Sequence, residues 1–501
     1  MLKKIKNNNE LLFAVLVNVV FILIYNLMFY PRFHSDLDIL MQSSIYGVSG
    51  IVSSYILYSN ILIGKSLTIL GSILPNMPWY IIFHFVLIFS ALIIVTYVMV
   101  KRNKSLTGKV LAVVTVAFVG YECYVEPNYM KTSVLLCVCA AYLLYYAYEM
   151  NAKNKIIGVV FFAVLSSMIC FSAFIISAIA GFGIVGLYCL IRGCAKEWKI
   201  VIAVTLMCII ILVAGARIFD TAMYTRNNRE VSLNYRDSVE KLFGYGVPEY
   251  SNEMMDAYGL DELHYNSISQ GLFFSQGTNQ LEIVKGISEE KQEFSLDSII
   301  NFFRTIPIAL FKTGMMYYLV VLCAVAFVTG NKKEIILATI GMLLVEYFVF
   351  YLFNACEYEW ICFIIMLPVS LLLLVESNKF EIKDSKSLIA YVMALGVILY
   401  LNFSSTMVTS VREEGTEELY MQAQPEYIHI VDMVEYLRAG SVYHVYDHVS
   451  IPGNVFLMNG AYGLMDEFAY WTQLQAPEED VEYNWLYNPT KVKTESLFLE
   501  E

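Results

Sequence analysis

Two acidic residues just after the first long apolar run are the best placed to do chemistry. Asp36 and Asp38 follow an apolar stretch that extends from position 11 to about position 30. A carboxylate beside lipid is costly unless another group pairs with it or a reaction uses it. If this stretch is helical, the two acids lie about 200° apart around the helix, so at most one points into a cavity. On residue types alone, the plainer interpretation, two solvated acids capping an interfacial helix, is slightly favoured.

A second candidate site lies between the third and fourth predicted spans. Glu122 and Glu126 are close in sequence to Asn128 and Lys131. Such side chains can hydrogen-bond the hydroxyls of a polar ligand, although an ordinary polar turn has the same composition. Glu346 lies within a later predicted span, where an isolated acid is expensive and usually faces an interior cavity. We therefore predict substrate-binding roles for Glu126, Asn128, Lys131 and Glu346.

The composition indicates that these residues belong to a polytopic membrane protein. Of the 501 residues, 58% are hydrophobic and only 16% are charged, whereas a soluble domain is about half apolar and about a quarter charged. The formal net charge of -12 argues against a nucleic-acid partner, because phosphate binding needs clustered Lys and Arg. The cysteines are scattered, so neither a disulfide framework nor a metal site is expected. No cofactor is predicted, although the acids could hold a divalent cation.

About eleven apolar helices, each of which needs about 20 residues, are predicted to cross the membrane. They lie at about 11–30, 79–100, 110–125, 133–149, 156–170, 173–191, 200–219, 314–329, 335–354, 360–375 and 388–403. When these spans alternate, the short loops rich in Lys and Arg all fall on one side. Because such loops face the cytoplasm, we predict a cytoplasmic N-terminus and an extracytoplasmic C-terminus in a bacterial plasma membrane.

The predicted fold is an all-α bundle over residues 1–403, with outer loops at 31–78 and 220–300. Residues 51–72 are apolar enough to cross, but a crossing there would place the next basic cluster outside, so helices at the outer interface are preferred. The remaining residues, 404–501, are predicted to form a small extracytoplasmic α/β domain.

Within that domain, two sequence patterns define the predicted elements. The spacing of apolar residues over 426–439 predicts a helix, and the alternation over 441–446 predicts a strand. A helix that leads into a strand is typical of a small α/β unit.

Three short stretches in the first outer loop resemble a group of Firmicutes polytopic membrane proteins. Residues 36–41 read Asp-Leu-Asp-Ile-Leu-Met, residues 58–64 read Tyr-Ser-Asn-Ile-Leu-Ile-Gly, and residues 75–80 read Pro-Asn-Met-Pro-Trp-Tyr. The group carries Asp-Asp-x-x-Met, Asn-x-x-Leu-Gly and Pro-x-x-x-Trp-Tyr in the same order. The chain departs from this pattern in having Ile63 for leucine and in separating its two acids. Spacing to the methionine favours the second acid, and which acid matters stays open.

The arrangement as a whole resembles the GT-C superfamily of integral-membrane glycosyltransferases. The shared features are a first outer loop that opens with a short acidic motif, interfacial helices, about eleven spans and a soluble tail. The resemblance implies that the protein transfers a sugar from a polyprenyl-phosphate donor to a glycan or lipid acceptor on the outer side of the membrane.

The same resemblance implies roles for individual residues. Asp36 or Asp38 would act as the general base that takes a proton from the acceptor hydroxyl. The departing lipid phosphate needs positive charge nearby, and Arg304 and Lys312, which enter a span from the outer side, are the best placed candidates. Their plainer interpretation is that they anchor a helix end at the interface by snorkelling.

Two other classes of function remain open. A polysaccharide polymerase or ligase would use an arginine-rich outer loop, with which Arg226, Arg229 and Arg236 are compatible. A transporter or flippase would carry out no covalent chemistry, and such proteins tend to contain inverted repeats and paired helix breaks. No such pair is found in the sequence.

Overall fold

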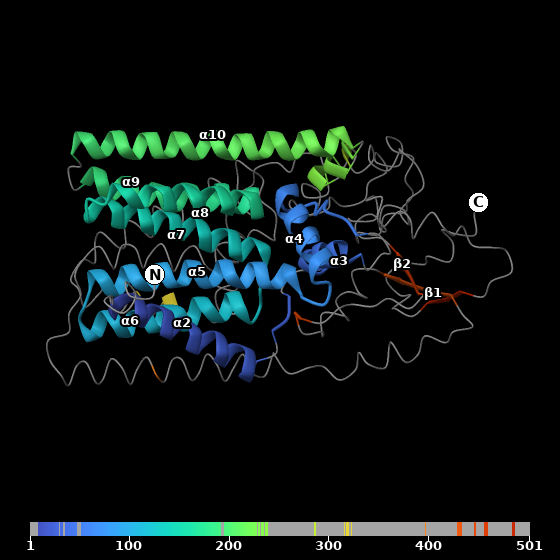
Figure 1. Cartoon of the computed structure of the whole chain (residues 1–501), viewed down its shortest axis with the longest axis horizontal. Coiled ribbons are helices and arrows are strands. Elements are labelled where there is room, and N and C mark those ends of the chain that lie inside the picture. The colour runs from blue at the N-terminus through green and yellow to red at the C-terminus, as the bar shows by residue number, and fades with distance from the viewer. Residues whose placement is uncertain are drawn as a thin grey trace, which may run out of the picture.

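The computed structural model describes most of the N-terminal half of the chain. It covers residues 9–29, 31–33, 36–47, 52–191, 195–227, 229–230, 232–234 and 236–238, and short pieces at 285–286, 315, 317–319, 322, 396, 428–432, 445–446, 455–458 and 483–485. Seven long helices run side by side through the described part (Figure 1). They are α2 (Asn9–Met28), α5 (Trp79–Arg102), α6 (Leu106–Tyr124), α7 (Tyr129–Glu149), α8 (Ile156–Ile169), α9 (Phe171–Ile191) and α10 (Lys196–Arg226).

Five of these helices, α2, α5, α6, α7 and α10, are long and apolar enough to cross a membrane, which marks the chain as a membrane protein. All seven coincide with the first seven predicted spans, apart from a few residues at their ends. The largest difference is at α10, which continues to Arg226 instead of ending near position 219. The other four predicted spans lie outside the described residues, so the total of eleven stays a prediction.

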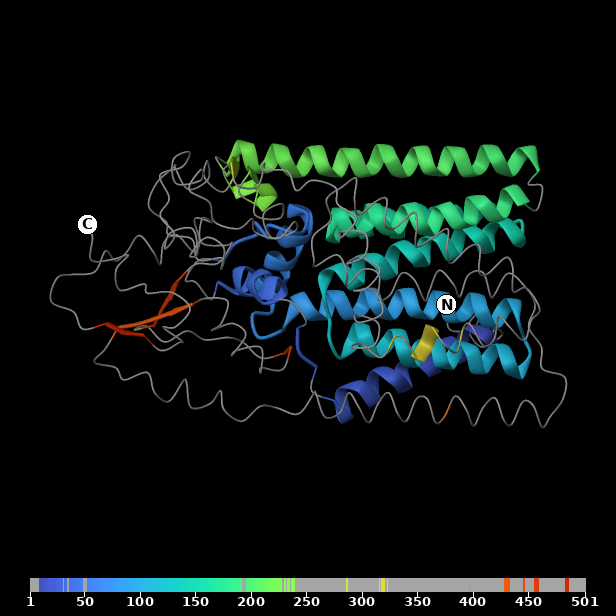
Figure 2. The same cartoon turned by 180° about the vertical axis from the view of Figure 1, so that it is seen from behind.

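The central helix is α7, and the lipid-facing surface lies mainly on α2 and α10. α7 packs against α5, α8 and α9, and its most apolar 18-residue stretch is 100% buried, against 17% for α2 and for α10. These two helices lie on opposite sides of the bundle (Figures 1 and 2). Because lipid solvates apolar groups, their exposed side chains are large and apolar. They include Leu12, Leu16, Val20, Leu23, Leu27, Val204, Met207, Ile210, Ile211 and Ile218.

The short basic loops that the structure describes meet at one end of the bundle, which we call the basic end. Four ion pairs connect them: Lys101–Glu10, Lys104–Glu10, Arg102–Glu149 and Lys153–Glu197, with N···O distances of 3.9, 3.6, 2.8 and 3.5 Å. The start of α2, the end of α5, the end of α7 and the start of α10 therefore lie together. For the described loops this agrees with the prediction that the basic loops share one side, whereas the same placement of the later loops and the assignment of that side to the cytoplasm stay predictions.

Two shorter helices, α3 (Asp36–Tyr46) and α4 (Ile61–Ile73), lie at the opposite end, which we call the α3–α4 end (Figure 1). α4 begins after Asn60, whose side chain accepts a hydrogen bond from the Leu62 backbone N–H at 3.0 Å, as a helix N-cap does. With 13 residues, α4 is about 20 Å long, less than the roughly 30 Å of a hydrocarbon core. This length agrees with the prediction that residues 51–72 do not cross.

The predicted helix over 426–439 is wrong for residues 428–432. Residues Ile428–Asp432 form the strand β1, which pairs in parallel with β2 (Val455–Met458) and β3 (Tyr483–Trp485) in the order β2-β1-β3. The apolar spacing of a short run can fit the period of a helix and that of a strand. Pairing with strands far along the chain then determines which of the two forms. In the predicted strand over 441–446, the described residues Val445 and Tyr446 form a turn instead. The α/β fold of the whole segment stays a prediction.

That turn is attached to the α3–α4 end of the bundle. The Val445 N–H donates to the Pro31 carbonyl at 2.9 Å, and the Tyr446 hydroxyl donates to Asn26 Oδ1 at 2.8 Å. Burial raises the pKa of Tyr446 to about 12, so the hydroxyl keeps its proton at neutral pH. Residues 445–446 therefore lie at the same end of the bundle as the end of α2, and the side of the membrane on which they lie stays a prediction.

Candidate functional site

Asp38 is buried where α3, α5 and α7 meet. Its side chain is 1% exposed, and Oδ1 accepts hydrogen bonds from the Tyr80 hydroxyl at 2.7 Å and from the Tyr129 backbone N–H at 3.0 Å. Tyr129 is the first residue of α7, so the carboxylate also lies at the positive end of a helix dipole. These contacts join three helices at one carboxylate. Asp36 begins α3, and its side chain lies outside the described residues.

Two of the three stretches that carry the sequence resemblance contact each other at this point. The Tyr80 hydroxyl bonds Asp38 and also lies 3.8 Å from Met41 Sδ. The acid and methionine of the first stretch thus meet the final tyrosine of the third. Packing between these residues gives a physical reason for their spacing.

The middle stretch fixes α4 against neighbouring helices. The Asn60 side-chain amide donates to the Ala216 carbonyl at 3.0 Å, and the Asn60 backbone N–H donates to the Met168 carbonyl at 2.7 Å. At Gly64, a Cβ atom would overlap the Ser54 carbonyl oxygen and lie 2.9 Å from the Ser54 carbonyl carbon. The asparagine and glycine of this motif are therefore explained by a helix cap and by close backbone packing.

The start of α7 is held by buried polar contacts. Asn128 Oδ1 accepts from the backbone N–H groups of Met130 at 2.7 Å and Lys131 at 3.3 Å, which makes Asn128 the N-cap of the helix. Thr132 Oγ1 donates to the Asn128 carbonyl at 3.1 Å and lies 3.0 Å from His84 Nδ1. These contacts connect α5 to α7 directly beside Asp38.

Lys131 forms a buried ion pair with Glu122. Its side chain is 0% exposed and that of Glu122 is 2% exposed, and Lys131 Nζ lies 3.0 Å from Glu122 Oε2. Nζ also donates to the carbonyl oxygens of Glu122 at 3.2 Å and Glu126 at 3.1 Å, and Glu126 Oε2 lies 3.9 Å away. Lys131 therefore satisfies carbonyls at the end of α6. These contacts give Lys131 and Asn128 structural roles, and their predicted roles in binding a sugar stay predictions.

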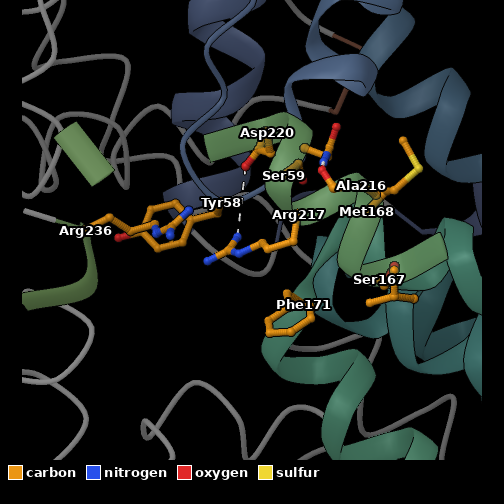
Figure 3. A pocket seen from close by; sticks show the side chains of 11 residues that line it. Tyr58, Ser59, Ser167, Met168, Phe171, Ala216, Arg217, Asp220 and Arg236 are labelled. Carbon is orange, nitrogen blue, oxygen red and sulfur yellow. Dashed lines mark hydrogen bonds and ion pairs between the residues drawn. The ribbon is translucent and has the colours of Figure 1, made fainter. Parts of the chain in front are cut away.

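A polar cleft lies beside α10 at the α3–α4 end. Residues 58–60, the junction of α8 and α9, the last turns of α10 and Arg236 line it, and it contains about 310 Å³ of space open to solvent. Figure 3 shows Arg217 and Asp220 on α10 with an ion pair between them, and Arg236 and Tyr58 beside them. The Asp220 carboxylate also accepts from the Ile61 N–H at 2.7 Å, so the wall of the cleft is joined to the first turn of α4.

Sequence reasoning missed Arg217 and Asp220 as site residues. Both fall at the end of the seventh predicted span or just beyond it, and their spacing of three residues places them on one face of α10. A charge inside an apolar run was the signal that could have found them. Arg236 was noted only as part of an arginine-rich loop, and its place in the cleft depends on the fold.

Several predicted site residues cannot be placed. Arg304, Lys312 and Glu346 lie outside the described residues. Within the residues that the structure does describe, no group of three or more His, Cys, Asp or Glu side chains is arranged to hold a metal ion.

The helices and the buried polar end define the class of protein as a polytopic helical membrane protein. Beyond that class, no protein-family model, no curated protein and no solved structure matches the chain.

Proposed function

We propose that the protein is a membrane glycosyltransferase that moves a sugar from a polyprenyl-phosphate carrier to a glycan or lipid acceptor on the outer side of the membrane. The observation that carries the proposal is the fixed position of α3. Asp38 ties this helix to α5 and α7 at the end of the bundle, so the acidic motif is rigidly held immediately outside the first span. A catalytic group requires such support from rigid elements.

In this proposal the two acids have different roles. Asp38 is buried and accepts two hydrogen bonds at Oδ1, so it acts as a positioning residue. Positions 36 and 38 are about 200° apart around a helix, so the two acids do not share one face. Asp36 is therefore proposed as the general base.

The proposed reaction is a displacement at the anomeric carbon. The acceptor hydroxyl oxygen attacks this carbon while Asp36 takes the hydroxyl proton. The bond between the anomeric carbon and the phosphate oxygen breaks, and its electron pair leaves with the polyprenyl phosphate. Cationic groups near that oxygen stabilise the developing charge.

Replacing Asp36 with asparagine is expected to lower sugar transfer about 10²- to 10⁴-fold, because the amide cannot accept the proton. Binding of the carrier lipid should be retained. Asp38→Asn is the matched control, since its amide oxygen can still accept from Tyr80 and Tyr129, and it should lose less than about 10-fold. The measurement is release of polyprenyl phosphate from carriers loaded with labelled hexoses or pentoses, using the full chain in nanodiscs.

The two variants together show whether Asp36, Asp38 or neither residue acts as the general base. Loss of transfer in Asp38→Asn alone would move the base to Asp38. Transfer at the wild-type rate in both variants would exclude the mechanism. Movement of an intact sugar-loaded lipid across the bilayer, without release of the phosphate, would identify a transporter instead.

A further inference from the structure

The cleft beside α10 is lined by two positively charged side chains and one negatively charged side chain. Two guanidinium groups, from Arg217 and Arg236, and one carboxylate, from Asp220, line it. The carboxylate is already engaged, because Oδ1 accepts from the Ile61 N–H at 2.7 Å and Oδ2 lies 4.0 Å from Arg217 Nη1. Arg236 is engaged as well, because its Nε and Nη2 donate to Asp237 Oδ1 at 2.8 and 2.7 Å. The charge that faces an incoming group is therefore mainly that of Arg217.

The arginines are held at fixed positions. Arg236 is 5% exposed, its Nη1 donates to the Leu57 carbonyl at 3.0 Å, and it also pairs with Asp237. The Arg217 guanidinium lies over the Phe171 ring, 5.1 Å from the ring centroid. Because these long side chains are already ordered before a ligand binds, less conformational entropy is lost on binding.

The cleft also borders the surface that faces lipid. Arg217 is 39% exposed and stands beside Ile218, while Ile210 and Ile211 are exposed on the same helix. A lipid with its chain along α10 would bring its headgroup to the end of this helix, where the arginines lie.

We propose that this cleft binds the phosphate group of a membrane lipid, with Arg217 and Arg236 as its cationic contacts and the lipid chain along α10. Guanidinium groups suit this ligand because their planar array of donors matches the oxygens of a phosphate. That the lipid is a polyprenyl phosphate rests on the proposed function. The binding of a lipid phosphate at this position rests only on the cleft.

The test is equilibrium binding of polyprenyl phosphate to the full chain in phosphatidylcholine nanodiscs, measured by native mass spectrometry. Arg217→Gln is expected to weaken binding about ten-fold or more, because it removes a charge-assisted contact. Arg217→Lys should keep part of the affinity, since it retains the charge. Arg226→Gln is the matched control, because Arg226 is an exposed arginine on α10 and does not line the cleft.

Arg236 needs a second measurement because it is buried and could affect folding. Arg236→Gln is expected to weaken binding to a similar extent, and it counts only if its melting temperature matches the wild type. If it does not fold, Arg217→Gln carries the test.

Other probes identify the group that is bound. The corresponding polyprenol should bind much more weakly than the phosphate, and inorganic phosphate should compete only at far higher concentration. Equal binding of polyprenyl phosphate by Arg217→Gln and Arg226→Gln would overturn the proposal and leave Arg217 as an interface anchor. Competition by inorganic phosphate at the concentration of the lipid would also overturn it, in favour of a site for free phosphate.

The binding assay contains no sugar, so it is independent of the transfer reaction. Lipid binding that depends on Arg217, in a protein whose Asp36→Asn variant behaves like the wild type, would support the cleft and exclude the transferase mechanism. Loss of transfer in Asp36→Asn without any dependence of binding on Arg217 would support the transferase mechanism and exclude the lipid site in the cleft.

Discussion

Replacing Lys131 with methionine is expected to destabilise the protein by about 3–5 kcal/mol, because it leaves the buried Glu122 carboxylate without its cation. The closest oxygen of that carboxylate lies 3.0 Å from Nζ, and both side chains are almost completely buried. Two carbonyl oxygens at the end of α6 would lose a donor as well. The measurement is the free energy of unfolding of the full chain in mixed micelles titrated with SDS.

Two further variants show whether the buried charge is the cause. Glu122→Gln combined with Lys131→Met removes both charges and should recover part of the lost stability. Lys153→Met breaks the exposed pair with Glu197, whose N···O distance is 3.5 Å, and should change stability by less than about 1 kcal/mol. Equal effects of Lys131→Met and Lys153→Met would contradict a structural role for Lys131 and strengthen its predicted role in binding.

Replacing Gly64 with alanine is expected to destabilise the protein by about 1–3 kcal/mol or more, because the added methyl group overlaps backbone atoms. It would overlap the Ser54 carbonyl oxygen and lie 3.1 Å from Ile56 Cγ1. Backbone cannot turn aside as the end of a flexible side chain can, so α4 must shift. The melting temperature and the free energy of unfolding should both fall.

The same helix provides a matched control for this substitution. No atom lies within 4 Å of a Cβ built at Gly71, so Gly71→Ala should stabilise α4 by up to about 1 kcal/mol through helix propensity. If both alanine variants raise the melting temperature, the close packing of α4 on residues 54–56 is incorrect.

The long helices could be predicted from the sequence because the signal for each one is local. It consists of the length of the apolar run and the charged residues that flank it. The environment of Asp38 could not, because its two donors lie 42 and 91 residues further along the chain. Its flanking sequence is that of an ordinary solvated acid. Only the packing of α3 on α5 and α7 buries it.

The cleft and the strand β1 are two other features that could not be predicted from local sequence. Arg217 comes from the seventh span, and Arg236 bonds a backbone carbonyl 179 residues earlier in the chain, so no window of sequence contains the site. The apolar residues of Ile428–Asp432 fit a helix as well as a strand when read alone. Pairing with the parallel strands at 455–458 and 483–485 makes this segment a strand. The spacing of residues within the segment does not indicate these partners.

The attachment of Tyr446 to Asn26 has a consequence for the order of folding. The two residues are 420 positions apart, and at a synthesis rate of about 5–20 residues per second the ribosome needs roughly 20–80 s to connect them. Throughout that interval the end of α2 exists without its partner. The first seven helices are therefore all synthesised before this contact can form, and they have that time in which to insert and pack without it.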